Sequence, residues 1–256
     1  MISDRLLGKV IVLAGAGGIG NEVARRYASE GAAVVLGDVN SDLARKVASE
    51  IQAAGGQAHG LELDGASEAS VRAAIDCAVT QFGGLDGFHA NYSAFDEADG
   101  ANDVTSLPMG SYDRIMDTNA RGFVICTQLA VPALLERGGG CMVYTSSGAA
   151  YIGEPVRLAY AMSKAAIHAL ARHVANRFGP DGIRANVICP GVIVHENLLA
   201  FMTPEMEDAF REGTALKNRL GKPQDIAAMA ALLMSDEGSF ITGQAISVDG
   251  GTIMHP

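Results

Sequence analysis

Cysteine is scarce in this sequence, and no cysteine lies in a spacing typical of a metal site or a redox pair. Among the 256 residues there are four, three of them in apolar runs: Cys77, Cys126, Cys141 and Cys189. No Cys-x-x-Cys pair, HExxH motif or His/Cys cluster is present. We therefore expect no bound metal, and we expect buried, inert thiols, which fits a reducing cytoplasm.

Long apolar segments are also missing. No uncharged apolar run reaches the ~20 residues of a membrane-spanning helix, and the first residues lack the charged-then-apolar form of a signal peptide. The formal net charge is −10, with acidic and basic residues interspersed, which argues against a broad nucleic-acid-binding surface. We expect a cytoplasmic protein with neither membrane nor nucleic acid as a partner.

Linkers, repeats and low-complexity segments are absent as well. Seven apolar runs alternate with helical patterns, with no proline- or serine-rich interruption that would divide the chain into two small domains. This alternation predicts a single α/β domain over 1–256, a doubly wound Rossmann-type fold with a seven-stranded parallel sheet. Strands are expected near 9–14, 33–38, 57–62, 86–91, 141–146, 184–189 and 245–248. Helices are expected near 19–30, 41–54, 68–82, 111–137, 158–178 and 223–234.

A glycine-rich turn joins the first predicted strand to the first predicted helix. The run Val10-Ile11-Val12-Leu13-Ala14 leads into Gly15-Ala16-Gly17-Gly18-Ile19-Gly20, and Asp38 ends the second strand eighteen residues after Gly20. A glycine loop followed by an acid at this distance is the dinucleotide-binding fingerprint, in which backbone and helix N-terminus accept the pyrophosphate. Asp38 would accept hydrogen bonds from the adenosine ribose and so favour NAD over NADP; alternatively, it caps the following turn.

A tyrosine and a lysine lie four residues apart in an alanine-rich helical segment. Tyr160 and Lys164 therefore project from one helix face. A nearby ammonium is expected to lower the phenol pKa, making Tyr160 usable as a proton donor or acceptor. Thirteen residues before Tyr160, a buried strand ends in Ser146 and Ser147, where open α/β sheets bind ligands. The sequence thus predicts an acid–base site at the edge of the sheet.

Together these motifs resemble those of the short-chain dehydrogenase/reductase family, over essentially the whole chain. The resemblance implies four catalytic residues: Asn119, Ser147, Tyr160 and Lys164. It implies that the cofactor NAD is bound by Tyr160, Lys164, the glycine loop and Asp38, and also by Asp64, Gly65, Asn91, Pro190, Gly191 and Ile193. The family resemblance also points to a homotetramer. The predicted helix from about Leu158 supports an oligomer, because it is apolar nearly all round.

The resemblance further implies how the four residues act. Tyr160 would give a proton to the carbonyl oxygen, or take it from the alcohol, while Ser147 hydrogen-bonds the same oxygen. Lys164 would lower the phenol pKa and bind the nicotinamide ribose, and Asn119 would hold a water that links Lys164 to solvent. Other interpretations stay open for several of these residues. Ser146 competes with Ser147, and only the thirteen-residue offset from Tyr160 favours Ser147; Asn119 would otherwise lie on the helix surface, and Asp64 would cap a loop.

Three features depart from the family pattern. The glycine turn has two residues between Gly15 and Gly18 where the family has three, Tyr92 is bulky where the family is small, and His195 occupies a position that is commonly threonine. His195 would hydrogen-bond the cofactor or substrate, or alternatively point into solvent. It is part of a predicted substrate lid at about 194–218. The apolar residues of this segment would contact the ligand or anchor the lid: Leu198, Leu199, Phe201, Met202, Met206 and Phe210.

We therefore expect an NAD-dependent enzyme that acts on a secondary alcohol or its ketone, with an apolar small-molecule substrate that the sequence does not identify. A reductase of acyl-carrier-protein-linked ketones is the alternative within enzymes, although those enzymes generally use NADPH, which Asp38 disfavours. A dinucleotide-sensing protein without catalysis is the alternative from another class. An intact set of four catalytic residues argues against a sensor.

Overall fold

Seven parallel strands form one sheet at the centre of the chain, in the order β3-β2-β1-β4-β5-β6-β7. The computed structural model describes residues 4–254. Residues 1–3, which begin the segment that lacks the form of a signal peptide, lie outside the described residues. The strands are β1 (Val10–Ala14), β2 (Ala33–Asp38), β3 (Gln57–Glu62), β4 (Gly87–Ala90), β5 (Gly140–Thr145), β6 (Ile183–Pro190) and β7 (Ala245–Val248).

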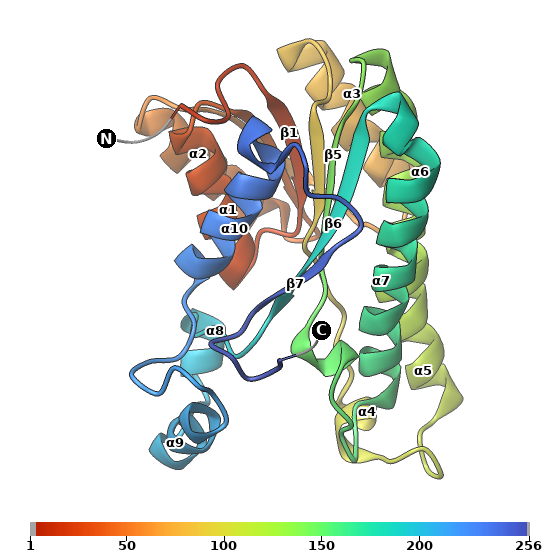
Figure 1. Cartoon of the computed structure of the whole chain (residues 1–256), viewed down its shortest axis with the longest axis vertical. Coiled ribbons are helices and arrows are strands. Elements are labelled where there is room, and N and C mark those ends of the chain that lie inside the picture. Colours follow the sequence, from red (N-terminus) through yellow and green to blue (C-terminus); the bar gives the residue numbers. More distant parts are fainter. Residues whose placement is uncertain (1–3, 255–256) are drawn as a thin grey trace.

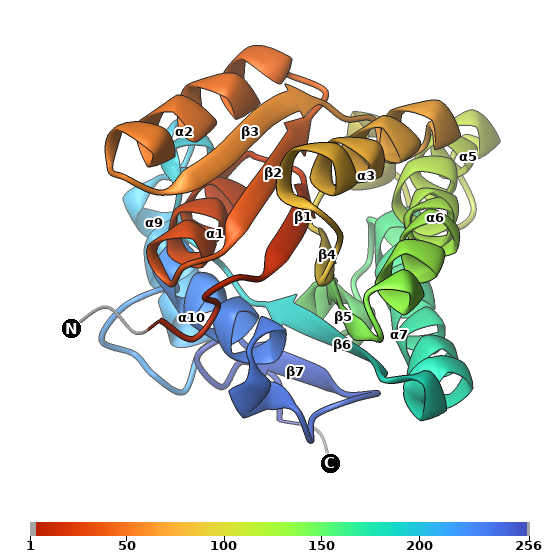
Figure 2. The same ribbon diagram turned by 90° about the horizontal axis from the view of Figure 1, so that it is seen from above.

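Helices cover both faces of the sheet (Figures 1 and 2). One face is covered by α1 (Gly18–Ser29), α2 (Ser41–Ala53) and α10 (Pro223–Met234). The other is covered by α3 (Glu68–Phe82), α6 (Gly122–Glu136) and α7 (Leu158–Phe178). The remaining helices are α4 (Glu97–Ala101), α5 (Met109–Met116), α8 (Glu196–Leu199) and α9 (Pro204–Glu212). No helix within residues 4–254 is long and apolar enough to cross a membrane.

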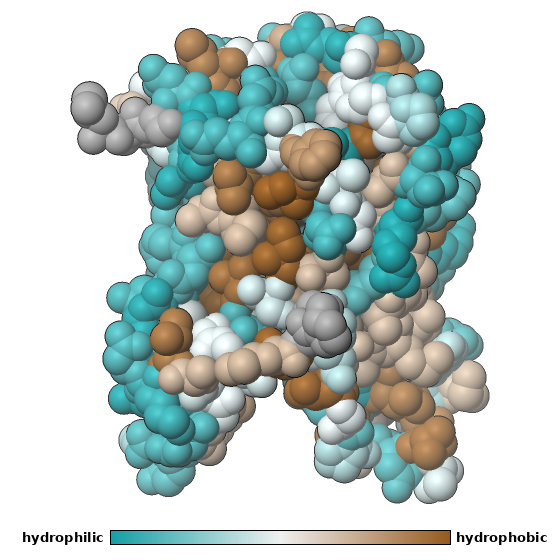
Figure 3. Space-filling model, viewed as in Figure 1, coloured by the Kyte–Doolittle hydropathy of each residue, from teal (hydrophilic) through white to brown (hydrophobic). Residues whose placement is uncertain are grey.

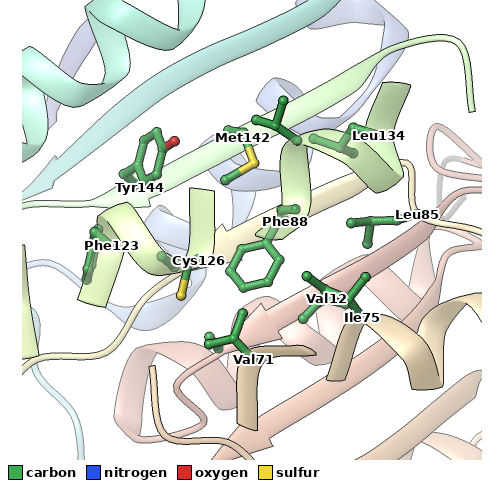
Figure 4. Close-up of a cluster of buried hydrophobic side chains, with 14 of the residues drawn as sticks. Val12, Val71, Ile75, Leu85, Phe88, Phe123, Cys126, Leu134, Met142 and Tyr144 are labelled. Carbon is green, nitrogen blue, oxygen red and sulfur yellow. The ribbon is translucent and has the colours of Figure 1, made fainter. Parts of the chain in front are cut away.

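The core explains why the central strands are apolar throughout. All five residues of β1 are buried, because a parallel strand between two helical layers packs on both of its faces. Figure 4 shows one of the two core clusters, in which Phe88 of β4 lies among side chains from the neighbouring strands and from α3 and α6. This layered core holds the carboxyl ends of the strands at one edge of the sheet.

The chain changes direction at the centre of the sheet. Strand β1 pairs with β2 on one side and with β4 on the other, so the loops after β1 and β4 diverge to opposite faces. A crevice at such a switch point is where open α/β sheets bind ligands. The glycine loop follows β1 and Asn91 follows β4, so the fold brings both to this crevice.

The predicted fold is confirmed, and the seven strands and five of the six helices begin and end within one residue of the predicted bounds. The exception is the helix predicted over 111–137. It consists of α5, a π-helical turn at Asp117–Arg121, and α6. A π-helical turn holds one residue more than an α-helical turn, and it places Asn119 in the interior. The short helices α4, α8 and α9 were not predicted.

Candidate active site

The glycine loop turns sharply from β1 into α1. Gly15 has φ +104° and Gly17 has φ +27°, conformations that favour glycine. A Cβ on Gly20 would lie 1.9 Å from the carbonyl oxygen of Gly15, so no larger residue fits where the loop and the helix cross. The N-terminus of α1 therefore reaches the crevice with its backbone N–H groups in a position suited to an anion.

Asp38 lies beside the glycine loop at the end of β2. Its Oδ2 accepts a hydrogen bond from the backbone N–H of Ala16 at 2.8 Å, and its Oδ1 accepts one from that of Asn40 at 2.9 Å. The carboxylate thus caps the following turn, as the alternative interpretation proposed, and also ties the loop to the sheet. Its negative charge stands next to the loop in either role.

The loops after β3 and β4 complete this side of the crevice. Asp64 accepts a hydrogen bond from the backbone N–H of Ala66 at 2.9 Å and so caps its own loop. The ring of Tyr92 packs on Phe123, with 4.9 Å between the centroids. A Cβ on Gly65 would lie 2.1 Å from Cζ of Tyr92. The ring of Tyr92 therefore fills the space beside Gly65 and packs against the core.

Three of the four residues expected to be catalytic meet at the start of α7. Tyr160 and Lys164 lie in its first two turns, and the Ser147 hydroxyl is near enough to the Tyr160 hydroxyl to lower the pKa of the phenol. Lys164 Nζ lies 5.7 Å from the centroid of the Tyr160 ring and donates a hydrogen bond to the carbonyl oxygen of Thr145 at 3.1 Å. Ser146 points away, since its hydroxyl donates to the carbonyl oxygen of Lys164. The geometry therefore favours Ser147 over Ser146.

Asn119 is fully buried rather than on the helix surface. Its Oδ1 accepts a hydrogen bond from the backbone N–H of Ala94 at 2.6 Å, and its Nδ2 donates to the carbonyl oxygen of Ala94 at 3.0 Å. Nδ2 also lies 3.4 Å from Ser163 Oγ. The carboxamide thus holds the loop after β4 against α7, one residue from Lys164.

The expectation of a lowered phenol pKa is wrong for this structure. Burial raises the pKa of Tyr160, and the hydrogen bond from Ser147 offsets only part of that effect. Burial also lowers the pKa of Lys164 to about 7, and its ammonium lies over the rings of Tyr160 and Phe123 rather than beside the phenol oxygen. Tyr160 is therefore protonated at neutral pH, the state that donates a proton to a carbonyl oxygen.

Sequence reasoning missed Asp99, which caps the helix that carries Tyr160. Asp99 of α4 is buried, and its carboxylate accepts hydrogen bonds from the backbone N–H groups of Ala159 at 2.9 Å and Tyr160 at 3.1 Å. One signal was available, because the residue before α7 is Arg157, which cannot accept a hydrogen bond as an N-cap. A helix without a local cap requires an acceptor from elsewhere in the chain.

Phe95 was also missed. Its ring stacks on Tyr160 with centroids 5.0 Å apart and an interplanar angle of 25°, yet Phe95 is 71 % exposed. The predicted lid also exposes apolar side chains at this end of the molecule. Leu199 lies in α8, and Phe201 follows that helix. Figure 3 shows the molecule hollowed at this end, between the lobe of α8 and α9 and the lobe of α4.

The lid segment begins beside the glycine loop. Ile193 is buried and pairs with Gly221, and a Cβ on Gly191 would lie 2.7 Å from Cβ of Asp249, next to Pro190. The half-buried imidazole of His195 packs on the loop, because a Cβ on Gly18 would lie 2.4 Å from its Cγ. His195 therefore does not point into solvent, and burial lowers its pKa.

An open cleft of about 330 Å³ lies where His195, the glycine loop and α2 meet. Two buried polar atoms that line it, Asn21 Oδ1 and His195 Nδ1, have no hydrogen-bond partner among the described residues. The carboxylates of Glu22, Glu50 and Glu196 also line this cleft, whereas Asp38, Tyr160 and Lys164 do not, so it is separate from the crevice that holds Tyr160. The fit to a dinucleotide rests instead on the glycine loop, where bare backbone leads to the N-terminus of α1 beside Asp38. No group of three or more His, Cys, Asp or Glu within residues 4–254 is placed to hold a metal ion.

Comparison with known proteins agrees with this geometry. Residues 13–253 match a family model described as enoyl-(acyl carrier protein) reductase. The 7α-hydroxysteroid dehydrogenase of Escherichia coli is 37 % identical over 97 % of this chain and 96 % of its own length. The chain belongs to the short-chain dehydrogenase/reductase family. It is thus an oxidoreductase by family, as the sequence motifs predicted.

Other similar proteins have related names. Cyclohexanol dehydrogenase of an Acinetobacter strain is 34 % identical over 98 % of this chain and 97 % of its own length. Among solved structures, a 7α-hydroxysteroid dehydrogenase complexed with NADH and 7-oxo glycochenodeoxycholic acid has a TM-score of 0.90 and 36 % identity, covering 99 % and 98 % of the two chains. A short-chain dehydrogenase/reductase of Serratia marcescens has a TM-score of 0.88 and 31 % identity, covering 97 % and 99 %.

Proposed function

We propose that this chain is an NAD-dependent dehydrogenase that interconverts a secondary alcohol and its ketone. The observation that carries the proposal is the meeting of Tyr160, Ser147 and Lys164 at the start of α7. Lys164 is connected from there to the glycine loop through Thr145 and Asn91. When bound, NAD supplies or accepts the hydride. The residues of the chain then position the substrate and move a proton at its oxygen. The test is the absorbance change of the nicotinamide with a panel of alcohols and ketones, using NADH and NADPH in turn.

Each side chain has a separate role in this proposal. Tyr160, protonated at neutral pH, gives its proton to the carbonyl oxygen during reduction, and Ser147 donates a hydrogen bond to the same oxygen. Lys164, whose pKa is lowered to about 7 by burial, would bind the nicotinamide ribose hydroxyls from its place over the Tyr160 ring. Asn119 fixes the loop after β4 and would hold a water between Lys164 and solvent. For cofactor binding we propose the glycine loop, Asp38, Asp64, Gly65, Asn91, Pro190, Gly191 and Ile193.

A ring-containing, apolar substrate suits this site best. Phe95 presents an exposed aromatic face directly beside Tyr160, and the relatives named above are a hydroxysteroid and a cyclohexanol dehydrogenase. A reductase of carrier-protein-linked substrates is favoured only by the description of the family model. Such reductases generally use NADPH, whose 2′-phosphate would be repelled by the carboxylate of Asp38 beside the loop. A non-catalytic sensor would have no need of all four catalytic side chains.

Replacing Phe95 with alanine should lower kcat/KM for a cyclic secondary alcohol such as cyclohexanol. An aromatic contact contributes about 0.5–1.5 kcal/mol, which corresponds to about 2–12-fold. The same variant should keep kcat/KM for a short acyclic alcohol nearly unchanged, since that substrate offers little apolar surface to the ring. Equal losses for both substrates would show that Phe95 only supports Tyr160 and does not select the substrate.

Replacing His195 with threonine should change the pH dependence of NAD binding. Burial lowers the pKa of His195, so in the free protein its imidazole gains charge only below the usual value near 6.5. A protonated imidazole beside the pyrophosphate strengthens binding, so NAD affinity should rise as the pH falls below about 6.5. The threonine variant should lack this rise in a titration followed calorimetrically. Parallel profiles in the two proteins would contradict a contact between His195 and the cofactor.

We also propose a homo-oligomer, with the homotetramer as the form that the family resemblance implies. The outward side of the first half of α7 carries an exposed apolar set, Met162, Ala165, Ala166 and Ala169, whereas its second half exposes polar residues. Edge strand β7 is only half-buried throughout, and Figure 3 shows apolar side chains gathered along α10 and β7.

The free thiols support our proposal of a cytoplasmic location.

A further inference from the structure

A histidine lies in the middle of the sheet and has no part in the proposed reaction. His89 of β4 is fully buried, with hydrogen-bond partners on both ring nitrogens: Tyr27 of α1 and Thr145 of β5. Burial lowers the pKa of His89 to about 3, so the imidazole is neutral near pH 7. A neutral imidazole has one donor and one acceptor nitrogen, and its partners decide which is which.

The direction of every hydrogen bond in this group can be worked out. The Gly15 carbonyl oxygen can only accept, so Asn91 donates to it from Nδ2 at 3.1 Å. This fixes Asn91 Oδ1 as the acceptor of the Thr145 hydroxyl proton at 2.9 Å. Because Thr145 has only that one hydroxyl proton, His89 Nε2, at 2.9 Å, must be the donor to its oxygen. His89 Nδ1 is then unprotonated and accepts from the Tyr27 hydroxyl at 2.9 Å.

The result is a chain of four hydrogen bonds with one direction, from Tyr27 through His89, Thr145 and Asn91 to the carbonyl oxygen of Gly15. Tyr27, His89 and Thr145 are all buried, and burial raises the pKa of Tyr27, which keeps its hydroxyl protonated. Bonds that share one direction polarise and strengthen one another in a low dielectric. This chain of hydrogen bonds therefore fixes the position of the glycine loop relative to the sheet.

Thr145 also connects this chain to the proton-transfer site. Its carbonyl oxygen accepts the hydrogen bond from Lys164 Nζ at 3.1 Å, while its hydroxyl reaches Gly15 through Asn91. One residue of β5 is thus shared by the loop expected to bind the pyrophosphate and the lysine expected to bind the nicotinamide ribose.

We propose that His89 and Thr145 are positioning residues that hold the glycine loop and Lys164 in the arrangement that binds the dinucleotide. The role of the loop as the cofactor site rests on the function proposed above. Loss of the Thr145 hydroxyl leaves His89 Nε2 and Asn91 Oδ1 without their partners, so the Asn91 side chain that holds the Gly15 carbonyl oxygen is no longer fixed from the sheet. The affinity for the dinucleotide should therefore fall by more than the accompanying loss of folding stability explains.

The test compares two isosteric substitutions at equally buried threonines. Thr145 and Thr127 are each 6 % exposed, and Thr127 hydrogen-bonds Tyr144 and the Phe123 carbonyl oxygen in the other part of the core. Thr145→Val should raise the Kd for NADH about tenfold, as expected when buried polar groups lose their partners. Thr127→Val should leave Kd within about twofold at a similar loss of stability in urea. Equal Kd values in the two variants would overturn the proposal.

Two measurements do not depend on the cofactor. The ¹⁵N chemical shifts of the His89 ring should show protonated Nε2 and unprotonated Nδ1 between about pH 5 and pH 8, well above its pKa; the opposite tautomer would overturn the assignment. Hydrogen exchange at the amides of 15–20 should be faster in Thr145→Val than in Thr127→Val. If the wild type bound no NADH, the proposed function would be wrong. Independently of that result, equally slow hydrogen exchange at the amides of 15–20 in both variants would contradict the positioning role.

Discussion

Replacing Tyr160 with phenylalanine should lower kcat by about 10²–10⁴-fold, the usual contribution of general acid–base catalysis. Phenylalanine keeps the ring that stacks on Phe95 and over which Lys164 lies, and it removes only the hydroxyl that meets Ser147. Binding of NADH should therefore change little. Steady-state kinetics and a fluorescence titration with NADH measure the two quantities separately.

Tyr144→Phe is the matched control for this substitution. Tyr144 is also buried, and its hydroxyl bonds Thr127 away from the proposed site, so its loss should affect stability but not turnover. Wild-type turnover in the Tyr160 variant would remove Tyr160 from the proposed mechanism. A parallel loss of NADH affinity in that variant would mean that the hydroxyl positions the cofactor rather than transferring a proton.

Replacing Asp38 with alanine should narrow the preference for NAD over NADP by a large factor. In the wild type, the 2′-phosphate of NADP would approach the carboxylate beside the glycine loop, and like-charge contacts of this kind cost several kcal/mol. With NADP, kcat/KM should therefore rise, whereas with NAD it should fall because the ribose loses its acceptor. The ratio of kcat/KM for the two cofactors is the quantity to measure.

Two further variants separate the effect of the Asp38 charge on cofactor preference from its effect on the structure of the loop. Asp38→Asn retains an oxygen that can accept from the Ala16 or Asn40 backbone N–H, so it tests the charge with less disturbance of the loop. Asp42→Asn removes a charge from an exposed side chain in the first turn of α2 and should not alter the ratio. Greater efficiency of the wild type with NADP than with NAD would contradict the proposed role of Asp38.

Local patterns in the sequence were sufficient for the fold and for part of the site. Apolar runs and helical periodicity gave strand and helix bounds because each depends on residues close in the chain. The glycine loop was also predictable, since a strand, a tight turn and a helix N-terminus need particular residues at fixed spacing. For the same reason, Tyr160 and Lys164, four residues apart on one helix, could be assigned to one face before the structure was known.

The sequence alone therefore determined the doubly wound sheet, the family and the residues carried by its motifs. Only the tertiary structure decided how those residues are placed: the burial that raises the pKa of Tyr160, the cap from Asp99, and the contact of His195 with Gly18. Each depends on segments far apart in the chain, and on how much water the packed core excludes. Neither spacing nor periodicity records such distances, so these features emerge only when the layers are assembled.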